Sequence, residues 1–249
     1  MLSVVIPVLD ETAHLERLLA DLTRACREAE VIVVDGGSTD GTQDLVRRFP
    51  RVTLIEAERG RARQMNAGAR VATGRALLFL HADTTLPPGA QGAIQDALRS
   101  PGVVGGRFDV RFDSPRPIFK LIATMMNIRS RLSGISTGDQ GIFVRRDTFE
   151  VMGGYAAIPL MEDVEFSRRL KRQGRLACLR LRVTTSARKW EREGALRTIV
   201  LMWTLRLLYA VGVRPARLHR WYYGGHADGS AGARGFPNSG NPRKTAGTH

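Results

Sequence analysis

The chain contains the run Val31-Ile32-Val33-Val34-Asp35-Gly36-Gly37-Ser38-Thr39-Asp40-Gly41-Thr42. Its four β-branched residues predict a strand buried inside a parallel sheet, and the glycines after Asp35 predict a turn into a helix. A carboxylate at that strand end can accept hydrogen bonds from a ribose or a base N–H. A second interpretation stays open from this run alone: Asp35 shapes the turn and Asp40 caps the helix.

Strands and helices alternate outward from this run. We expect strands at residues 3–7, 31–34, 52–56 and 76–80. We expect helices at residues 12–26 with Thr12 as N-cap, from 38–41 to 49, and at 62–72. This alternation predicts βαβ units around a parallel sheet, in which ligands bind beyond the carboxyl ends of the strands. Asp10, Asp35 and Asp83 follow three of the strands and are therefore candidate site residues.

The second half of the chain has a less regular pattern. Here we expect a helix ending near residue 98, a strand at 103–112, a helix at 118–132, a short strand at 141–145 and a helix at 164–173. Residues 196–213 are strongly apolar, but Arg197 and Arg206 fall on opposite sides of a helix. Three placements stay open for this segment: packing on the domain, lying in a membrane interface, or spanning a bilayer. We expect residues 225–249 to be disordered.

The composition is that of a globular protein with a strongly basic charge. The 249 residues carry a formal net charge of +14, which favours phosphates, nucleic acid or an anionic membrane surface as partners. No zinc-finger spacing or aromatic-basic pattern accompanies this charge, so a nucleic-acid partner is disfavoured. Cys26 and Cys178 predict buried free thiols in a reducing compartment. The first apolar run has no basic segment before it and is broken by Pro7, so we expect a strand and a cytoplasmic protein.

Several stretches, in order, resemble the family-2 glycosyltransferases over roughly residues 1–190. Besides residues 31–42 they read Val4-Val5-Ile6-Pro7-Val8-Leu9-Asp10-Glu11, Arg59-Gly60-Arg61-Ala62-Arg63-Gln64-Met65-Asn66-Ala67-Gly68, Leu80-His81-Ala82-Asp83 and Met161-Glu162-Asp163-Val164-Glu165-Phe166-Ser167-Arg168-Arg169-Leu170. The resemblance implies a GT-A-like, Rossmann-like α/β fold, three layers with a mostly parallel mixed sheet, plus a C-terminal helical segment. It implies a nucleotide-sugar-binding and catalytic domain at residues 1–190 and a helical extension at 191–224.

The resemblance also implies where a nucleotide binds. The implied contacts are Pro7, Glu11, Asp35, Arg59, Arg61 and Gln64. Asp35 would hold the uracil or ribose, and Asp10 replaces an asparagine of the family. The two arginines and Gln64 would flank the diphosphate, because arginines at a helix N-terminus suit such an anion. From the residues alone, an ordinary amphipathic helix start stays open for this stretch.

Residues 80–83 stand where the family has its Asp-x-Asp motif. The resemblance implies a divalent cation, Mg²⁺ or Mn²⁺, held by Asp83 together with diphosphate oxygens. His81 replaces the first carboxylate of the motif. It can bind manganese, stack near the sugar or serve as a bonded polar residue, and we favour a role other than metal ligand.

Glu162 and Asp163 resemble the acidic pair that precedes a helix in inverting members of the family. Asp163 is the implied base, because an attacking hydroxyl must lose its proton, and Glu162 is the alternative base or an acceptor contact. Asp139 and Gln140 are implied to bind the acceptor. From the residues alone, acidic residues favoured at a helix start and a glycine turn with a local hydrogen bond stay open.

The resemblance implies an inverting, metal-assisted transfer of one sugar from a nucleoside-diphosphate sugar, with a uridine donor favoured, to an unknown hydroxyl. The processive Gln-x-x-Arg-Trp motif is replaced by Lys189-Trp190-Glu191-Arg192, which favours single transfer. The basic charge and residues 196–213 allow a lipid-linked acceptor and peripheral attachment at the inner face of the cell membrane. Two rivals stay open: a nucleotidyltransferase on the same fold, and a non-enzymatic basic binding protein.

Overall fold

The computed structural model describes residues 1–224, so the expectation for residues 225–249 lies outside the described part. Within that part, one mixed sheet has the strand order β3-β2-β1-β4-β7-β6-β8-β5. The strands are β1 (Leu2–Val8), β2 (Glu30–Asp35), β3 (Val52–Glu56), β4 (Ala76–Phe79), β5 (Thr84–Thr85), β6 (Val103–Phe112), β7 (Ile142–Arg145) and β8 (Arg175–Thr185). Strands β3, β2, β1 and β4 run parallel, and β7 pairs antiparallel with β4 and β6.

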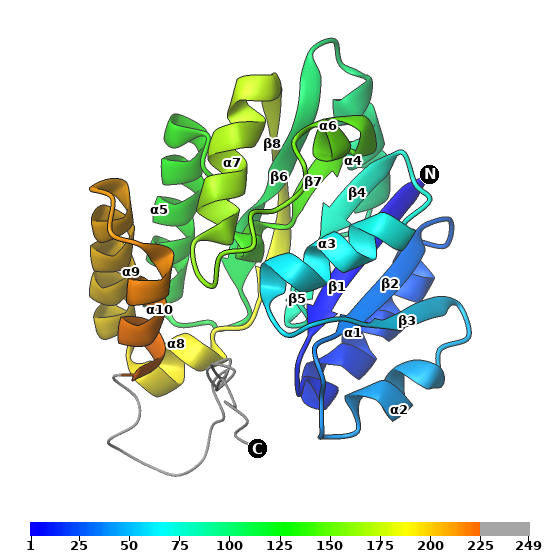
Figure 1. Cartoon of the computed structure of the whole chain (residues 1–249), viewed down its shortest axis with the longest axis horizontal. Coiled ribbons are helices and arrows are strands. Elements are labelled where there is room, and N and C mark those ends of the chain that lie inside the picture. The colour runs from blue at the N-terminus through cyan, green and yellow to red at the C-terminus, as the bar shows by residue number, and fades with distance from the viewer. Residues whose placement is uncertain (225–249) are drawn as a thin grey trace, which may run out of the picture.

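Helices cover both faces of this sheet (Figure 1). They are α1 (Thr12–Ala25), α2 (Thr42–Arg47), α3 (Arg61–Val71), α4 (Ala90–Arg99), α5 (Pro117–Ser133), α6 (Arg146–Val151), α7 (Glu162–Gln173), α8 (Arg188–Glu193), α9 (Ala195–Ala210) and α10 (Pro215–Gly224), with a 3-10 turn, η1, at Gly138–Gln140. One apolar cluster packs α1, α2, α4 and α5 on the sheet, and a second packs α3, α6 and α7 on its other face. The expected three-layer α/β fold is confirmed.

Strand β1 shows how the sequence produces these two layers. Leu2, Val4, Ile6 and Val8 belong to the first cluster, whereas Val5 belongs to the second. Alternate side chains of a strand point to opposite faces, so a continuous apolar run is what a sheet covered on both sides requires. The strands expected at residues 3–7, 31–34, 52–56, 76–80 and 103–112 are confirmed as β1, β2, β3, β4 and β6. Strands β2 and β4 are buried runs of the same kind, whereas the edge strand β3 has no buried residue.

The C-terminal helices form their own small core. Met161 and Val164 at the start of α7 pack with Leu205 of α9 and with Leu218 and Tyr222 of α10. This contact places α9 and α10 beside α5 at one end of the molecule, as Figure 1 shows. Within the described residues, no helix is both long enough and apolar enough to cross a membrane.

Several local expectations were wrong. Strand β8 was not expected: its short apolar run, residues 176–179, is flanked by Arg175 and Arg180, and only Val183 and Thr185 of the strand are buried. It pairs in parallel with β6 and antiparallel with β5. Cys178 on this strand is a free thiol as expected, but it is only half-buried.

The cap of the first helix also differs from the expectation. Thr12 is the first residue of α1 and not its N-cap, since the N-cap position is Glu11. Asp40 instead accepts hydrogen bonds at the starts of two helices. Its carboxylate accepts hydrogen bonds from the backbone N–H of Thr12 (3.2 Å) and of Thr42 (3.0 Å). Asp40 therefore ties the first turns of α1 and α2 together.

Candidate functional site

A cleft of about 360 Å³ opens beyond the carboxyl ends of β1 and β4. It is lined by Pro7, Val8, Leu9, Glu11, Arg61, Gln64, His81, Ala82, Asp83, Thr137, Gly138, Asp139, Leu160, Met161, Glu162, Asp163, Thr185, Ser186, Lys189, Trp190, Thr198, Met202, Leu205, Arg206, Tyr222 and Tyr223. These residues come from both halves of the sheet and from the C-terminal helices. The cleft lies beside the point between β1 and β4 where the strand order reverses, the position at which open α/β sheets bind ligands.

Four of the six residues expected to contact a nucleotide line this cleft, namely Pro7, Glu11, Arg61 and Gln64. Gln64 has little freedom there, because its side chain is only 2% exposed and its Nε2 donates to the backbone oxygens of Val8 (2.8 Å) and Val34 (2.9 Å). It therefore fixes the ends of β1 and β2 against α3. Arg59 and Asp35 are not among the lining residues.

Asp35 is fully buried at the end of β2 and organises the turn that follows. Its carboxylate accepts hydrogen bonds from the backbone N–H of Gly37 (3.1 Å) and of Ser38 (3.0 Å), from the Ser38 hydroxyl, and from Nε2 of Gln43 (2.7 Å). The turn-shaping role considered from the sequence is thus present in the structure. The contact of Asp35 with a nucleoside stays a prediction.

Two carboxylates, Glu11 and Asp83, face the cleft from the ends of β1 and β4. Burial, and then the nearby charge of Asp83, raise the pKa of Glu11. A cation bound beside them would relieve this repulsion, because opposite charge stabilises the ionised form of a carboxyl group. Within residues 1–224, however, no group of three or more His, Cys, Asp or Glu side chains could hold a metal ion. A cation bound here would therefore need further ligands from a substrate.

His81 pairs with a carboxylate across the cleft. Its Nδ1 lies 3.2 Å from Oδ1 of Asp139 in η1. Burial opposes ionisation of Asp139, but the hydrogen bond and charge of His81, together with Arg61, lower the pKa of this carboxyl group. A Cβ on residue 138 would overlap the His81 ring, so glycine at that position permits the close approach. The contact corresponds to one of the alternatives given for His81, a bonded polar residue, and a role other than metal ligand stays a prediction.

Glu162 and Asp163 lie in the first turn of α7, which begins two residues before the helix expected at residues 164–173. The Asp163 carboxylate accepts hydrogen bonds from the backbone N–H of Gly138 (3.1 Å) and of Val164 (2.7 Å). Burial and the adjacent charge of Glu162 nevertheless raise the pKa of Asp163 to about 6. Met161 before them has φ 69°, a left-handed conformation that non-glycine residues rarely adopt. Such backbone strain is concentrated at functional sites.

Arg61 places a positive charge beside the acidic side of the cleft. Its Nη1 lies 3.9 Å from Oε1 of Glu162, and half of the Arg61 side chain (52%) remains exposed. Burial opposes its charge, but Glu162, Tyr223, Asp139 and Asp163 outweigh this effect and raise the pKa of the guanidinium. A fixed positive charge therefore faces the cleft beside the acidic pair.

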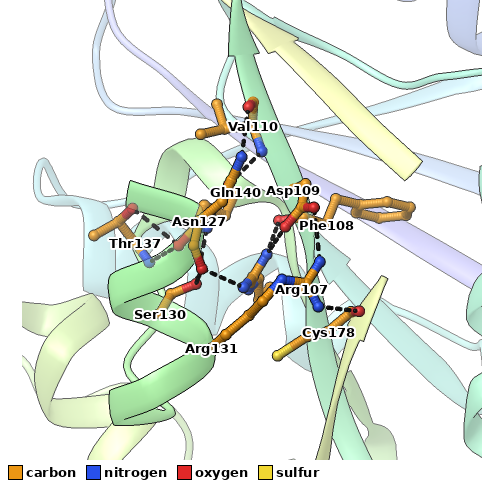
Figure 2. Close-up of polar contacts among 10 residues, drawn as sticks. All are labelled: Arg107, Phe108, Asp109, Val110, Asn127, Ser130, Arg131, Thr137, Gln140 and Cys178. Atoms are coloured by element: carbon orange, nitrogen blue, oxygen red, sulfur yellow. Dashed lines mark hydrogen bonds and ion pairs between the residues drawn. The ribbon is translucent and has the colours of Figure 1, made fainter. Parts of the chain in front are cut away.

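Gln140 does not line the cleft, although we expected it to bind the acceptor. Figure 2 shows it inside a buried network behind η1. Its Oε1 accepts a hydrogen bond from the Thr137 backbone N–H (3.2 Å), and its Nε2 donates to the Ser130 hydroxyl (3.1 Å). Because Gln140 is fully buried and bonded at both ends of its amide, it supports the turn that carries Asp139.

The same network joins η1 to strands β6 and β8 (Figure 2). Arg107 is 1% exposed and donates to the Asp109 carboxylate and to the backbone oxygen of Asn127 (3.1 Å). Arg131 donates to the other Asp109 oxygen (2.7 Å). Asn127 bonds both backbone groups of Val110 through its amide. These paired charges hold α5 and η1 in a fixed position against the sheet.

Sequence reasoning missed the cleft residues of the C-terminal helices. Lys189 and Trp190 of α8 and Tyr222 and Tyr223 of α10 line the cleft. Lys189 Nζ donates to the Tyr222 hydroxyl, and burial lowers the pKa of Lys189. Of these four residues, the sequence drew attention only to Lys189 and Trp190, because they stand where processive members of the family carry the Gln-x-x-Arg-Trp motif.

Residues 3–157 match the family described as Glycosyl transferase family 2, which is more than half of the chain. The chain belongs to this family. The Aeromonas hydrophila protein named undecaprenyl-phosphate 4-deoxy-4-formamido-L-arabinose transferase is 31% identical over 159 residues, covering 58% of this chain and 48% of the relative. The Mycobacterium bovis protein named PGL/p-HBAD biosynthesis glycosyltransferase is 41% identical over 93 residues, covering 34% of this chain and 36% of the relative. The chain thus spans less than half the length of these curated relatives.

Solved structures of other proteins share the fold of this family-2 protein. A Pyrobaculum calidifontis mannosyltransferase in complex with GDP-Man and Mn²⁺ superimposes with a TM-score of 0.66 at 22% identity, covering 91% of this chain and 70% of that one. S. aureus TarS 1–349 in complex with UDP-GlcNAc gives a TM-score of 0.55 at 18% identity, covering 74% of this chain and 58% of that one. At these identities the likeness supports the fold alone.

Proposed function

We propose that this family-2 protein transfers a single sugar from a nucleoside-diphosphate sugar, with a uridine donor favoured, to an acceptor hydroxyl with inversion. The observation that carries the proposal is the half-buried Asp163 carboxylate, which faces the cleft with a pKa raised to about 6. A base needs a pKa near the working pH to take a proton efficiently. The proposed catalytic unit is residues 1–190, with 191–224 as a helical extension that completes the cleft wall.

The donor would lie along the ends of β1 and β4, and the acceptor beside α7. Pro7, Glu11 and Arg61 line the donor side, where the guanidinium suits a diphosphate. The acceptor hydroxyl oxygen attacks the anomeric carbon, the bond from that carbon to the diphosphate oxygen breaks, and the hydroxyl proton passes to Asp163. Asp139, held by His81, is available to accept a hydrogen bond from a sugar hydroxyl.

A divalent cation fits this donor side when it is shared with the substrate. Mg²⁺ and Mn²⁺ prefer oxygen ligands, and Mg²⁺ commonly binds through one or two protein carboxylates plus substrate phosphates and water. Asp83 would hold the cation beside Glu11, whose pKa is raised by burial and then by the charge of Asp83. The bound cation would offset the charge that develops on the leaving diphosphate.

Thermal stability in the presence of candidate donors tests the proposal. We expect one nucleoside-diphosphate sugar to raise the melting temperature, with a larger rise in the presence of Mn²⁺, because a ligand that binds only the folded state stabilises it. Asp83→Asn should lose the Mn²⁺-dependent part of the rise. Asp96→Asn is a matched control, since this exposed residue of α4 lies outside the cleft and forms an ion pair with Arg99 of the same helix. No shift with any uridine or guanosine diphosphate sugar would contradict the proposal.

For the acceptor we propose a lipid-linked molecule, presented at a membrane surface. Helices α5 and α9 expose apolar stripes at helical spacing: Leu121, Met125, Ile128 and Leu132 on α5, and Leu196, Val200, Trp203, Leu207 and Val211 along and just after α9. Neither helix contains Asp or Glu, whereas both contain Arg. Apolar residues flanked by arginine are the pattern of surfaces that bind anionic lipid interfaces. The Aeromonas relative, named for undecaprenyl phosphate, supports this choice.

Cosedimentation with lipid vesicles tests the attachment. We expect the protein to bind vesicles that contain anionic phospholipid, and Trp203→Glu with Leu207→Glu to weaken this binding about tenfold or more, because burying one such apolar side chain contributes about 1.5–3 kcal/mol. Val71→Glu is the matched control: Val71 is an exposed apolar residue on α3, away from both stripes. Equal binding by the double variant and the wild type would contradict the proposed surface.

A further inference from the structure

A second cavity, of about 100 Å³, lies between α5 and α9. Its walls are mostly apolar and include Ile122, Met125, Met126, Ile199, Met202 and Trp203. The residues that line both this cavity and the larger cleft are Thr137, Asp139, Trp190, Met202 and Arg206. The small cavity therefore adjoins the cleft on its acceptor side, and its outer wall includes Met125 and Trp203 of the two exposed apolar stripes.

Arg129 of α5 also lines this cavity, and two of its guanidinium nitrogens have no hydrogen-bond partner within residues 1–224. Its Nε and Nη2 atoms are buried and make no hydrogen bond within residues 1–224. Buried polar groups nearly always have partners, so two unpartnered donors on one guanidinium require an explanation. Nε and Nη2 form the edge that grips an oxyanion with two parallel hydrogen bonds. Arg169 in this same chain uses that edge on Glu165, at 2.5 and 2.7 Å.

The charge on Arg129 is only weakly compensated. Burial lowers the pKa of its guanidinium, and the charges of Asp163 and Asp139 only partly offset this effect. Arginine nevertheless keeps its charge in proteins, so a positive group remains in a mainly apolar cavity beside the proposed base. A ligand with a negative charge and an apolar chain would satisfy both the guanidinium and the cavity walls.

We propose that this cavity binds the head of an amphiphilic acceptor, with an oxyanion, a phosphate or a carboxylate, on the Nε and Nη2 edge of Arg129 and the first carbons of its chain between α5 and α9. This inference rests on the proposed function for the identity of the ligand as acceptor. The oxyanion is the recognition element, and a hydroxyl of the same molecule meets Asp163. Arg129 is thus a binding and positioning residue.

Calorimetric titration of the full chain with small amphiphiles, without nucleotide or membrane, tests the inference. We expect octyl phosphate to bind about tenfold or more tightly than octanol, since hydrogen bonds to charged groups contribute about 1.5–3 kcal/mol. Octanoate and inorganic phosphate separate the two oxyanions and the contribution of the chain. Arg129→Met should remove the preference for octyl phosphate. Lys120→Met is the matched control, because it removes one charge from an exposed position of the same helix.

Equal binding of octyl phosphate and octanol by the wild type, or a preference that survives Arg129→Met, would overturn the inference. Arg129→Met should keep the wild-type melting temperature, because the two buried donors it removes make no hydrogen bond. If that variant does not fold, Arg129→Lys keeps the charge but cannot form the two parallel hydrogen bonds, and a reduced preference would support the same conclusion.

Donor binding is measured separately by thermal shift. Donor binding without octyl phosphate binding overturns only this inference, whereas the reverse result overturns the proposed function and leaves the oxyanion site supported.

Discussion

Asp163→Asn should lower the rate of sugar transfer by on the order of 10²- to 10⁴-fold, the usual contribution of a positioned base. The amide has the shape of the carboxylate and can still accept a hydrogen bond from Gly138 or Val164, whose N–H groups lie 3.1 and 2.7 Å from the Asp163 oxygens. It cannot take a proton from the acceptor. We therefore expect kcat to fall while the thermal shift by the donor is kept, and product formation with and without the substitution measures the loss.

The pH profile distinguishes this role from a structural one. Because burial and Glu162 raise the pKa of Asp163 to about 6, the carboxylate is protonated below that pH and ionised above it. Only the ionised form accepts a proton, so the wild-type rate should fall about tenfold for each pH unit below about 6 and reach a plateau above it. Asp163→Asn should lose this dependence, and Asp96→Asn should keep it. A wild-type rate that stays level down to pH 4.5 would remove Asp163 from the base role.

The sequence was sufficient to predict the parallel half of the sheet, because its strands are short apolar runs. Val31 to Val34 are almost fully buried, and no other element type explains four β-branched residues between two turns. Strand β8 could not be predicted in this way. Arg180, Leu181 and Arg182 lie exposed on it, so its pairing with β6 follows from tertiary contacts and not from a local pattern.

The residues of the candidate site likewise include some that a local sequence pattern predicts and others that only tertiary contacts explain. The position of Glu162 and Asp163 at the start of a helix could be predicted, since acidic residues there are a local pattern, whereas their role was implied only by the family resemblance and stays a prediction. The burial of Gln140 could not, because its partners Ser130 and Asn127 lie on a different helix and polar residues are buried only where such partners meet them. Arg129 gave no local signal either, since only the packing of α9 against α5 encloses its side chain.

Gly138→Ala should be the most damaging small substitution in the cleft. A Cβ at this position would overlap Nε2 and Cε1 of His81, whose side chain is only 14% exposed and has little room to move. Displacing the ring breaks its contact with Asp139, and moving η1 instead breaks the hydrogen bond from Gly138 to Asp163. Both shifts misplace groups that would meet the acceptor, and a displacement of about 1 Å can cost on the order of 10²-fold in rate.

Removing the opposing ring separates this steric cause from a general loss of stability. In a His81→Ala background the added methyl group has space, so Gly138→Ala should there lower the rate much less than it does in the wild type, and contacting residues are expected to show such non-additive effects. Gly92→Ala is the matched control: nothing lies within 4 Å of a Cβ at that position in α4. There the same change should stabilise the helix by about 0.5–1 kcal/mol. Equal losses from Gly138→Ala in both backgrounds would mean that contact with the His81 ring is not what requires glycine at this position.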